Sequence, residues 1–250
     1  DITGDSYFAF AQIYQLACRL GTHVVLAGDV FDVNRPDAAS VTVAVAEIDA
    51  HSAHSGRRTI YVQGQHEMAD PPWLGLSGAV WLNGETFDAG DVRFYGIDFT
   101  RKSDLAAALA DVPSDADVLV AHQVWRDHMG GGVAGAEGRF SDVPHVSRMV
   151  TGDFHGHRVT SVTGASGQAL SVLSPGTACM QAVDEDPVKY VFVLNDDLSF
   201  QSVRLPSRPA VADVVRSAGE LAAAVESLPR RVERAVAELW RVDSNGHNVA

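Results

Sequence analysis

Carboxylate, amide and imidazole side chains follow four short apolar runs of this sequence. They stand in the segments AGDVFD, GQHE, AHQ and GDFHGH, and the candidate residues are Asp29, Asp32, Gln65, His66, His122, Asp153 and His155. Ligands of open α/β sheets bind outside the carboxyl ends of the strands, so four such ends can converge on one crevice. Oxygen and imidazole ligands without a thiolate suit Mn²⁺, Fe or Zn²⁺. The four segments together predict a metal centre.

The spacing is compatible with a pair of ions. Two divalent ions roughly 3.5 to 4 Å apart need a bridging carboxylate, and such a pair activates water and clamps a phosphoryl group. Asp29, directly after a strand glycine, can supply the bridge. Taken singly, each segment has a plainer interpretation: GDVFD as a turn, His66 as a surface histidine and His122 as a core histidine. Their occurrence in series, each after a strand, favours the functional interpretation.

The elements that must position these residues alternate along the chain. Apolar runs of strand length, rich in Val, Ile, Tyr and Phe, predict strands at 23–29, 59–65, 91–98, 117–123, 148–155 and 190–197. Helical spacing of apolar residues predicts helices at 6–21, 37–56 and 103–112. Alternating strands and helices imply an α/β layered architecture. The glycine-rich segment 129–140 is expected to be a flexible loop.

Composition and charge restrict the classes of function. The chain has 250 residues and a formal net charge of −13, which disfavours a sequence-independent nucleic-acid binder unless bound cations cancel part of the charge. Two cysteines, Cys18 and Cys179, are too few for a disulfide framework, so we expect a cytoplasmic protein. No apolar run approaches the roughly 18 to 20 residues that cross a bilayer, and we expect no membrane partner.

The ends of the sequence suggest how the domains are organised. The composition changes near 205–211 and becomes rich in Ala, Glu and Arg, which predicts a first domain over 1–205 and the beginning of a smaller module over 206–250. The chain opens DITGDSYFAF, without an initiator methionine or a hydrophobic signal core. We therefore expect it to be part of a longer protein.

In their order, GDVFD, GQHE, AHQ and GDFHGH resemble the calcineurin-like metallophosphoesterases. That family usually shows D-x-H, G-D-x-x-D, G-N-H-D/E, a lone His after a strand, and G-H-x-H. Two longer stretches, DSYFAFAQIYQLACRLGTHVVLAGDVFDVNRPD and SPGTACMQAVDEDPVKYVFVLNDD, are similar to the SbcD-type DNA-repair exonucleases of that family, in a phage or bacterial version. The resemblance covers about residues 5 to 205, and the four motifs taken together are specific for the family.

The resemblance implies a fold and a role for each candidate residue. The fold would be a four-layer αββα sandwich of two mixed sheets, lacking its first strand, with residues 206–250 beginning a DNA-contacting cap. By resemblance, the metal ligands would be Asp29 as the bridge, Gln65, His122, Asp153 and His155. His66 would contact the phosphate and protonate the leaving oxygen, and Asp32 could orient His66.

The chain departs from the family pattern at four points. No D-x-H motif is present, and we expect it upstream of Asp1, so that this chain would bind metal more weakly than a complete one. Gln65 replaces the usual asparagine and adds one methylene group. Asp153 replaces an imidazole by a carboxylate, which would tighten cation binding and lower the Lewis acidity of the metal. Asp32 stands where the nuclease branch often has His.

The resemblance leads to one functional hypothesis and two alternatives. The leading hypothesis is hydrolysis of DNA phosphodiester bonds with two divalent ions, Mn²⁺ first and Fe or Zn²⁺ next. The partners implied are DNA and a coiled-coil ATPase subunit of the SbcC type, and a homodimer is compatible with it. The alternatives are a phosphomonoesterase or cyclic-nucleotide phosphodiesterase of the same fold, and a scaffold subunit with a degraded site.

Overall fold

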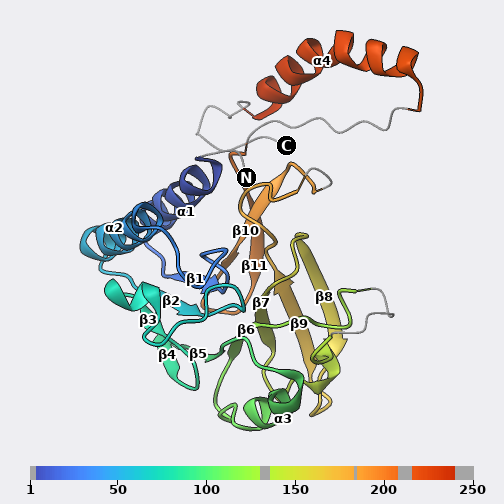
Figure 1. Cartoon of the computed structure of the whole chain (residues 1–250). Helices are drawn as coiled ribbons and strands as arrows, with labels where there is room; N and C mark the ends of the chain where they lie inside the picture. The colour runs from blue at the N-terminus through green and yellow to red at the C-terminus, as the bar shows by residue number, and fades with distance from the viewer. Residues whose placement is uncertain (1–3, 130–135, 183–184, 208–215, 240–250) are drawn as a thin grey trace.

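The computed structural model describes residues 4–129, 136–182, 185–207 and 216–239 (Figure 1). It is an α/β structure with a three-stranded sheet, a six-stranded sheet and a separate two-stranded hairpin. Half of the glycine-rich segment 129–140 that we expected to be a flexible loop, residues 130–135, lies outside the described residues. The same holds for 208–215 and 240–250 of the predicted second module.

The three-stranded sheet carries the first two candidate segments. Its strands, in order across the sheet, are β1 (Val24–Ala27), β2 (Thr59–Val62) and β3 (Val80–Trp81). All neighbours in it are parallel, because each connection is a crossover rather than a hairpin: α2 (Ala38–Ser55) joins β1 to β2, and a segment with the short helix η1 (Trp73–Leu76) joins β2 to β3. The expectation of two mixed sheets therefore does not hold for this sheet.

The six-stranded sheet is mixed, as expected, and carries the other two segments. Its strand order is β4-β5-β6-β7-β9-β8, with β5, β6, β7 and β9 parallel and the two edge strands antiparallel to their neighbours. The strands are β4 (Thr86–Ala89), β5 (Val92–Ile97), β6 (Val118–His122), β7 (Arg148–Gly152), β8 (Arg158–Thr163) and β9 (Ala169–Ser174). Helix α3 (Lys102–Ala110) links β5 to β6, and η2 (Phe140–Asp142) precedes β7.

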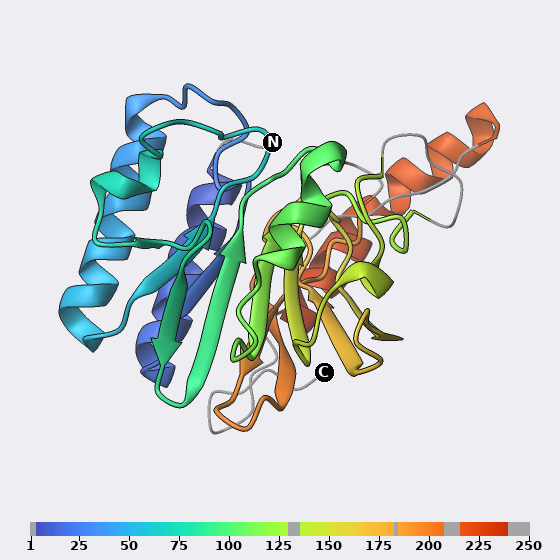
Figure 2. The same cartoon turned by 90° about the horizontal axis from the view of Figure 1, so that it is seen from below.

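The two sheets pack face to face, and helices cover their outer faces (Figures 1 and 2). The core between the sheets contains Ile60 and Val62 of β2 and Val118 and Val120 of β6. The intervening residue of β6, Leu119, points to the opposite face and packs with Leu105 of α3. Every residue of β6 is buried, which explains why this strand reads as a continuous apolar run.

Helices α1 (Asp5–Leu20) and α2 cover the three-stranded sheet. Tyr14 and Ile48 are buried with Tyr61 of β2 in the core on that side. Helix α2 begins at the cap residue Asp37, whose carboxylate accepts hydrogen bonds from the backbone of Ala39 and Ser40. This cap fixes where the loop after β1 ends, and the same loop carries Asp29 and Asp32.

The last elements are a hairpin and a helix. Strands β10 (Lys189–Leu194) and β11 (Phe200–Leu205) pair antiparallel, and Leu194 packs on the core between the sheets. Helix α4 (Ala218–Leu239) lies outside the two-sheet body in Figure 1. The division into a domain over 1–205 and a module over 206–250 stays a prediction.

Candidate functional site

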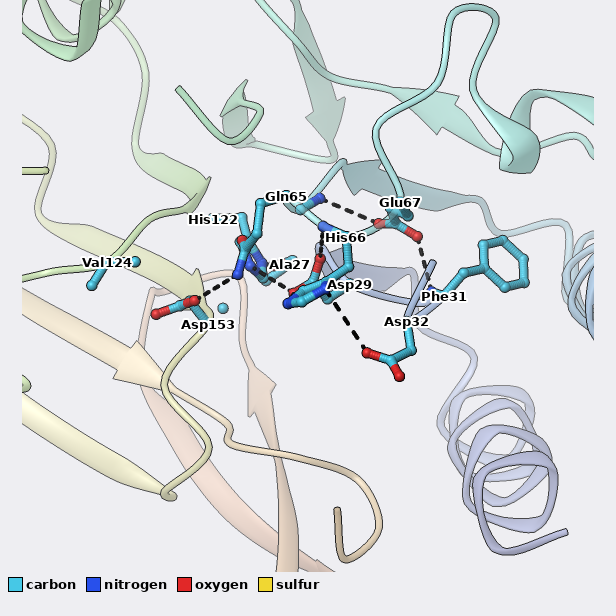
Figure 3. A network of polar contacts seen from close by, with 12 residues as sticks. Ala27, Asp29, Phe31, Asp32, Gln65, His66, Glu67, His122, Val124 and Asp153 are labelled. Carbon is cyan, nitrogen blue, oxygen red and sulfur yellow. Dashed lines mark hydrogen bonds and ion pairs between the residues drawn. The ribbon is translucent and has the colours of Figure 1, made fainter. Parts of the chain in front are cut away.

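The carboxyl ends of four strands bring the candidate residues together. Segments after β1 and β2 supply Asp29 and Gln65, His122 is the last residue of β6, and Asp153 follows β7 directly. Because β1 contacts both β6 and β7 across the sandwich, the ends of strands from both sheets meet. Figure 3 shows six of the seven predicted residues in one network of polar contacts: Asp29, Asp32, Gln65, His66, His122 and Asp153.

Asp29 contacts two of the other candidate residues, His66 and His122. Its Oδ1 accepts a hydrogen bond from the backbone N–H of His66 at 3.1 Å, and its Oδ2 lies 3.2 Å from Nε2 of His122 and 3.9 Å from Nε2 of His66. Burial works to raise the pKa of Asp29, but the contacts with His122 and His66 outweigh it and hold the pKa below its ordinary value. Asp29 is therefore an ionised carboxylate at neutral pH.

The backbone of the site is strained at two of the three predicted carboxylates. Asp29 has a φ of 53° and Asp153 a φ of 71°, and Leu198 is the other non-glycine residue with a positive φ in the described part of the chain. The left-handed region is unfavourable for residues other than glycine, although Asp tolerates it better than most. Such strain is characteristic of positions that the surrounding structure holds for function.

His122 is oriented by the backbone of β1. Its Nδ1 lies 2.6 Å from the carbonyl oxygen of Ala27, and because a carbonyl only accepts, Nδ1 carries a proton. Its Nε2 is buried and has no hydrogen-bond partner among the described residues, although Asp29 lies close enough for an ion pair. Burial works to lower the pKa of His122, but Asp29 outweighs it and raises the pKa above the ordinary value. A proton or a cation on Nε2 would therefore be stabilised by Asp29.

Gln65 and Asp153 form the second half of the network. The amide Nε2 of Gln65 donates a hydrogen bond to Oδ1 of Asp153 at 2.9 Å. The amide oxygen, Oε1, is buried and has no partner in the described part of the chain. Leaving a buried acceptor unpaired costs about 1 to 3 kcal/mol, so an unpaired oxygen of this kind is a position for a ligand.

Two glycines allow three of the four segments to approach so closely. A Cβ atom on Gly28 would clash with the ring of His122 and would lie 2.9 Å from the backbone nitrogen of Gly64. A Cβ atom on Gly64 would clash with the carboxylate of Asp29 and lie 2.7 Å from its backbone nitrogen. The glycines that end the apolar runs are thus required by packing around Asp29 and His122.

Glu67 holds the two loops of the three-stranded sheet together, and the sequence analysis did not single it out. Its carboxylate is buried and accepts hydrogen bonds from the backbone of Phe31 at 3.1 Å and of Gly64 at 3.3 Å. Burial raises its pKa to about 7. The available signal was its place in GQHE, directly after His66.

His66 and Asp32 form the accessible rim of the site. The side chain of His66 is 51% exposed and that of Asp32 is 97% exposed, with Nδ1 of His66 3.9 Å from Oδ1 of Asp32. The imidazole is therefore open to a substrate from solvent. Its backbone, by contrast, is fixed by the hydrogen bond to Asp29.

His155, the seventh predicted residue, takes a different direction. Its Nδ1 lies 2.8 Å from Oε1 of Glu185, although it follows Asp153 by only two residues. Its assignment as a metal ligand stays a prediction. Nearby, His157 contacts Ser202 and stacks on Tyr190 and Phe192 of the hairpin, as we would expect of a structural residue.

The types of donor present at this site are compatible with a divalent cation. In the described ranges, no group of three or more His, Cys, Asp and Glu side chains is already arranged to hold a metal ion. The compatibility rests instead on a mixed set. Oε1 of Gln65 is buried without a hydrogen-bond partner among the described residues, Nε2 of His122 lacks a hydrogen bond but lies 3.2 Å from Asp29, and Asp153 accepts a hydrogen bond from Gln65. Carboxylate, amide and imidazole donors suit Mn²⁺, Fe or Zn²⁺.

Comparison of the sequence with protein-family models found no match, and comparison with curated proteins found none either. The candidate site is thus defined by its own geometry. In the described part of the chain, every helix is too short or too polar to cross a membrane.

Proposed function

We propose that this chain is a metal-dependent phosphodiesterase that hydrolyses DNA, with the four-layer sandwich of the metallophosphoesterases. The observation that carries the proposal is the position of Asp29: a strained, ionised carboxylate whose two oxygens are divided between the backbone of His66 and the ring of His122. A carboxylate in this position contacts residues from both sheets, and it is suited to bind a cation between them.

The residues that would hold a cation are Asp29, Gln65, His122 and Asp153. When bound, a divalent cation would supply Lewis acidity toward a phosphoryl oxygen. Two cations that share Asp29, with Mn²⁺ first and Fe or Zn²⁺ next, remain the prediction. Further contacts hold two of these residues in position for a cation. The carbonyl of Ala27 fixes the ring of His122, and Glu67 fixes the loop that carries Gln65.

His66 would act on the leaving group. In phosphodiester hydrolysis, the oxygen of a water molecule bonds to phosphorus and the water loses a proton to the solvent. The bond from phosphorus to the 3′ oxygen breaks, and that oxygen takes up a proton. His66 is exposed on the rim and can deliver this proton, while Asp32 lies 3.9 Å from its other ring nitrogen and can orient it.

The test is cleavage of labelled single- and double-stranded DNA oligomers with Mn²⁺, by the unaltered chain and by Asp29→Asn and His122→Ala variants. We expect cleavage that EDTA abolishes and that both substitutions reduce at least about 100-fold. Asp88→Asn is a matched control, since Asp88 is paired with Arg93 on the six-stranded sheet. Cleavage that survives Asp29→Asn unchanged would refute the proposal.

One observation favours a phosphomonoesterase or a cyclic-nucleotide phosphodiesterase instead. The net charge of −13 repels an extended polyanion more than it repels a small phosphate ester. Turnover of a p-nitrophenyl phosphomonoester, a p-nitrophenyl phosphodiester and a DNA oligomer separates the candidates. The nuclease proposal predicts turnover of DNA above that of the phosphomonoester.

A further inference from the structure

Glu185 is the centre of a second polar cluster beside the candidate site. Its side chain is 10% exposed, and Oε2 accepts hydrogen bonds from Nζ of Lys189 at 2.8 Å and from Oγ1 of Thr177 at 2.8 Å. The backbone N–H of Gln181 also donates to Oε2, at 3.1 Å. The other oxygen, Oε1, is left for His155 at 2.8 Å. A buried carboxylate with four such contacts has a fixed position.

Lys189 and Thr177 use their polar groups to hold the carboxylate of Glu185 in position. The ammonium group of Lys189 is 5% exposed and also donates to Oγ1 of Thr177 at 2.8 Å, so that Lys189, Thr177 and Glu185 form a closed triangle of hydrogen bonds. Removing one partner from a buried ion pair is costly, which makes the triangle rigid.

Thr177 and the preceding Gly176 also fix the backbone of the turn that carries His155. The backbone N–H of Thr177 donates to the carbonyl oxygen of His155 at 3.1 Å. A Cβ atom on Gly176 would lie 2.6 Å from that oxygen and 2.9 Å from the backbone of Gly156. Thr177 and Gly176 therefore fix the backbone of His155, and Glu185 fixes its side chain.

The direction of the hydrogen bond determines which ring nitrogen of His155 is free. A carboxylate held by three other donors acts as an acceptor, so the proton of the contact belongs to Nδ1 of His155. In the neutral ring the lone pair is then on Nε2. No described residue hydrogen-bonds Nε2, and the side chain is 58% exposed.

A cavity borders this imidazole. It has a volume of about 380 Å³, and its lining includes His155, His157, Thr177, Lys189 and Tyr190. Glu185, Thr177 and Lys189 line the same cavity, so a group bound in it lies next to His155 and to the triangle that holds its position.

We propose that Glu185 is a positioning residue, which fixes His155 in the tautomer with a free Nε2 and thereby makes that nitrogen available to the candidate site. This inference rests on the proposed function for the use of Nε2, and on the Glu185 contacts for the tautomer itself. Glu185, which is 30 positions away in the sequence, would thus orient His155 so that it can act in the site as a metal ligand or a phosphate contact.

The tautomer can be measured without metal or DNA. In ¹⁵N-histidine-labelled chain, long-range ¹H–¹⁵N spectra at about pH 8, above the ordinary histidine pKa of about 6.5, distinguish the two neutral tautomers, and a His155→Asn variant assigns the signal. We expect the unaltered chain to carry the proton on Nδ1. Glu185→Ala should shift His155 toward the Nε2–H form, and Glu185→Gln, whose amide oxygen can still accept, should keep the Nδ1–H form.

The matched control is Asp186→Asn. Asp186 lines the same cavity, but its carboxylate accepts a hydrogen bond from the backbone of Val188. A second readout is Mn²⁺ affinity by calorimetry, which Glu185→Ala should weaken about tenfold while Glu185→Gln and the control stay close to the unaltered chain.

Each result decides the inference separately from the proposed function. An Nε2–H tautomer in the unaltered chain or in Glu185→Gln, or an unchanged tautomer in folded Glu185→Ala, would overturn it. If the unaltered chain binds Mn²⁺, equal Mn²⁺ affinity in Glu185→Ala would overturn it as well. The expected tautomers in a chain that binds no Mn²⁺ would support the positioning role of Glu185 and count against the proposed function. If Glu185→Ala does not fold, the tautomers of the unaltered chain and of Glu185→Gln decide.

Discussion

The amide nitrogen of Gln65 donates a hydrogen bond to Oδ1 of Asp153 at 2.9 Å, across 88 positions of sequence. Gln65 follows a strand of the three-stranded sheet and Asp153 follows a strand of the six-stranded sheet. The bond therefore ties the carboxyl ends of the two sheets together. It also leaves Oε1 of Gln65 buried without a partner among the described residues. The extra methylene of Gln65 thus has a structural use, since it lets the amide reach Asp153.

Gln65→Glu tests the electrostatics of this pair. The substitution replaces the donor amide by a carboxylate opposite Asp153, so the metal-free chain should be less stable by about 1 to 3 kcal/mol. A divalent cation would neutralise the repulsion, so Mn²⁺ should raise the Tm of Gln65→Glu more than that of the unaltered chain. Gln65→Met, which removes the hydrogen bond without adding charge, should be destabilised and show no such extra response. Equal responses of the two variants would contradict the predicted cation position.

Gly64→Ala tests the close packing of the loops. The added methyl group meets the carboxylate and backbone nitrogen of Asp29, so we expect a loss of about 1 to 3 kcal/mol in the free energy of unfolding. Gly75→Ala is the control, because its nearest neighbours lie at 3.9 Å and its stability should change by less than about 1 kcal/mol. Urea unfolding followed by circular dichroism measures both. Similar effects of the two substitutions would show that the loops are loose.

His66→Ala should impair hydrolysis in a way that depends on the leaving group. A general acid contributes about 10²- to 10⁴-fold, so DNA cleavage should fall within that range. A p-nitrophenolate leaving group needs no proton, so hydrolysis of bis(p-nitrophenyl) phosphate should fall far less. Because the imidazole is half exposed, Tm should change little. Equal losses on both substrates would exclude His66 as the proton donor.

His128 predicts a pH dependence of stability. Burial, with a smaller contribution from Arg158, lowers the pKa of His128 to about 4, against an ordinary value of 6.5. The unfolded chain then binds more protons than the folded chain between these values, so this contribution to stability is present above pH 6.5 and is lost as the pH falls through about 4. His128→Phe keeps a ring to stack on Phe154 and removes the titration.

The urea midpoint of His128→Phe should therefore change less between pH 7 and pH 5 than that of the unaltered chain. His54→Gln, at an exposed position near the end of α2, should follow the unaltered chain. Parallel midpoints for His128→Phe and the unaltered chain would mean that His128 is not buried in its neutral form.

Strands that read as continuous apolar runs were predictable from the sequence, whereas strands without such a run were not. All six predicted strands and the three predicted helices are present, because a run such as DVLVAH reflects burial on both faces. Strands β3, β4, β8, β9 and β11 were missed, although Leu170, Val172 and Leu173 of β9 are buried. In β8 most residues are exposed or half-exposed, so no apolar pattern marks it. Strand β3 is only two residues long.

For the site, the sequence predicted which residues follow the strands but not where their side chains point. Asp29, Gln65, His122 and Asp153 lie where the order of strands suggested. The bond from Gln65 to Asp153, the loop contacts of Glu67 and the turn of His155 toward Glu185 depend on residues far apart in the chain, and local patterns carry no information on such contacts.

The most direct test of the account is Mn²⁺ binding followed by electron paramagnetic resonance. We predict that the unaltered chain binds Mn²⁺ and that Asp29→Asn and His122→Ala each weaken binding at least about tenfold, while Asp88→Asn does not. Binding of equal strength by all four proteins, or no binding by the folded unaltered chain, would contradict the assignment of Asp29 and His122 to a metal centre.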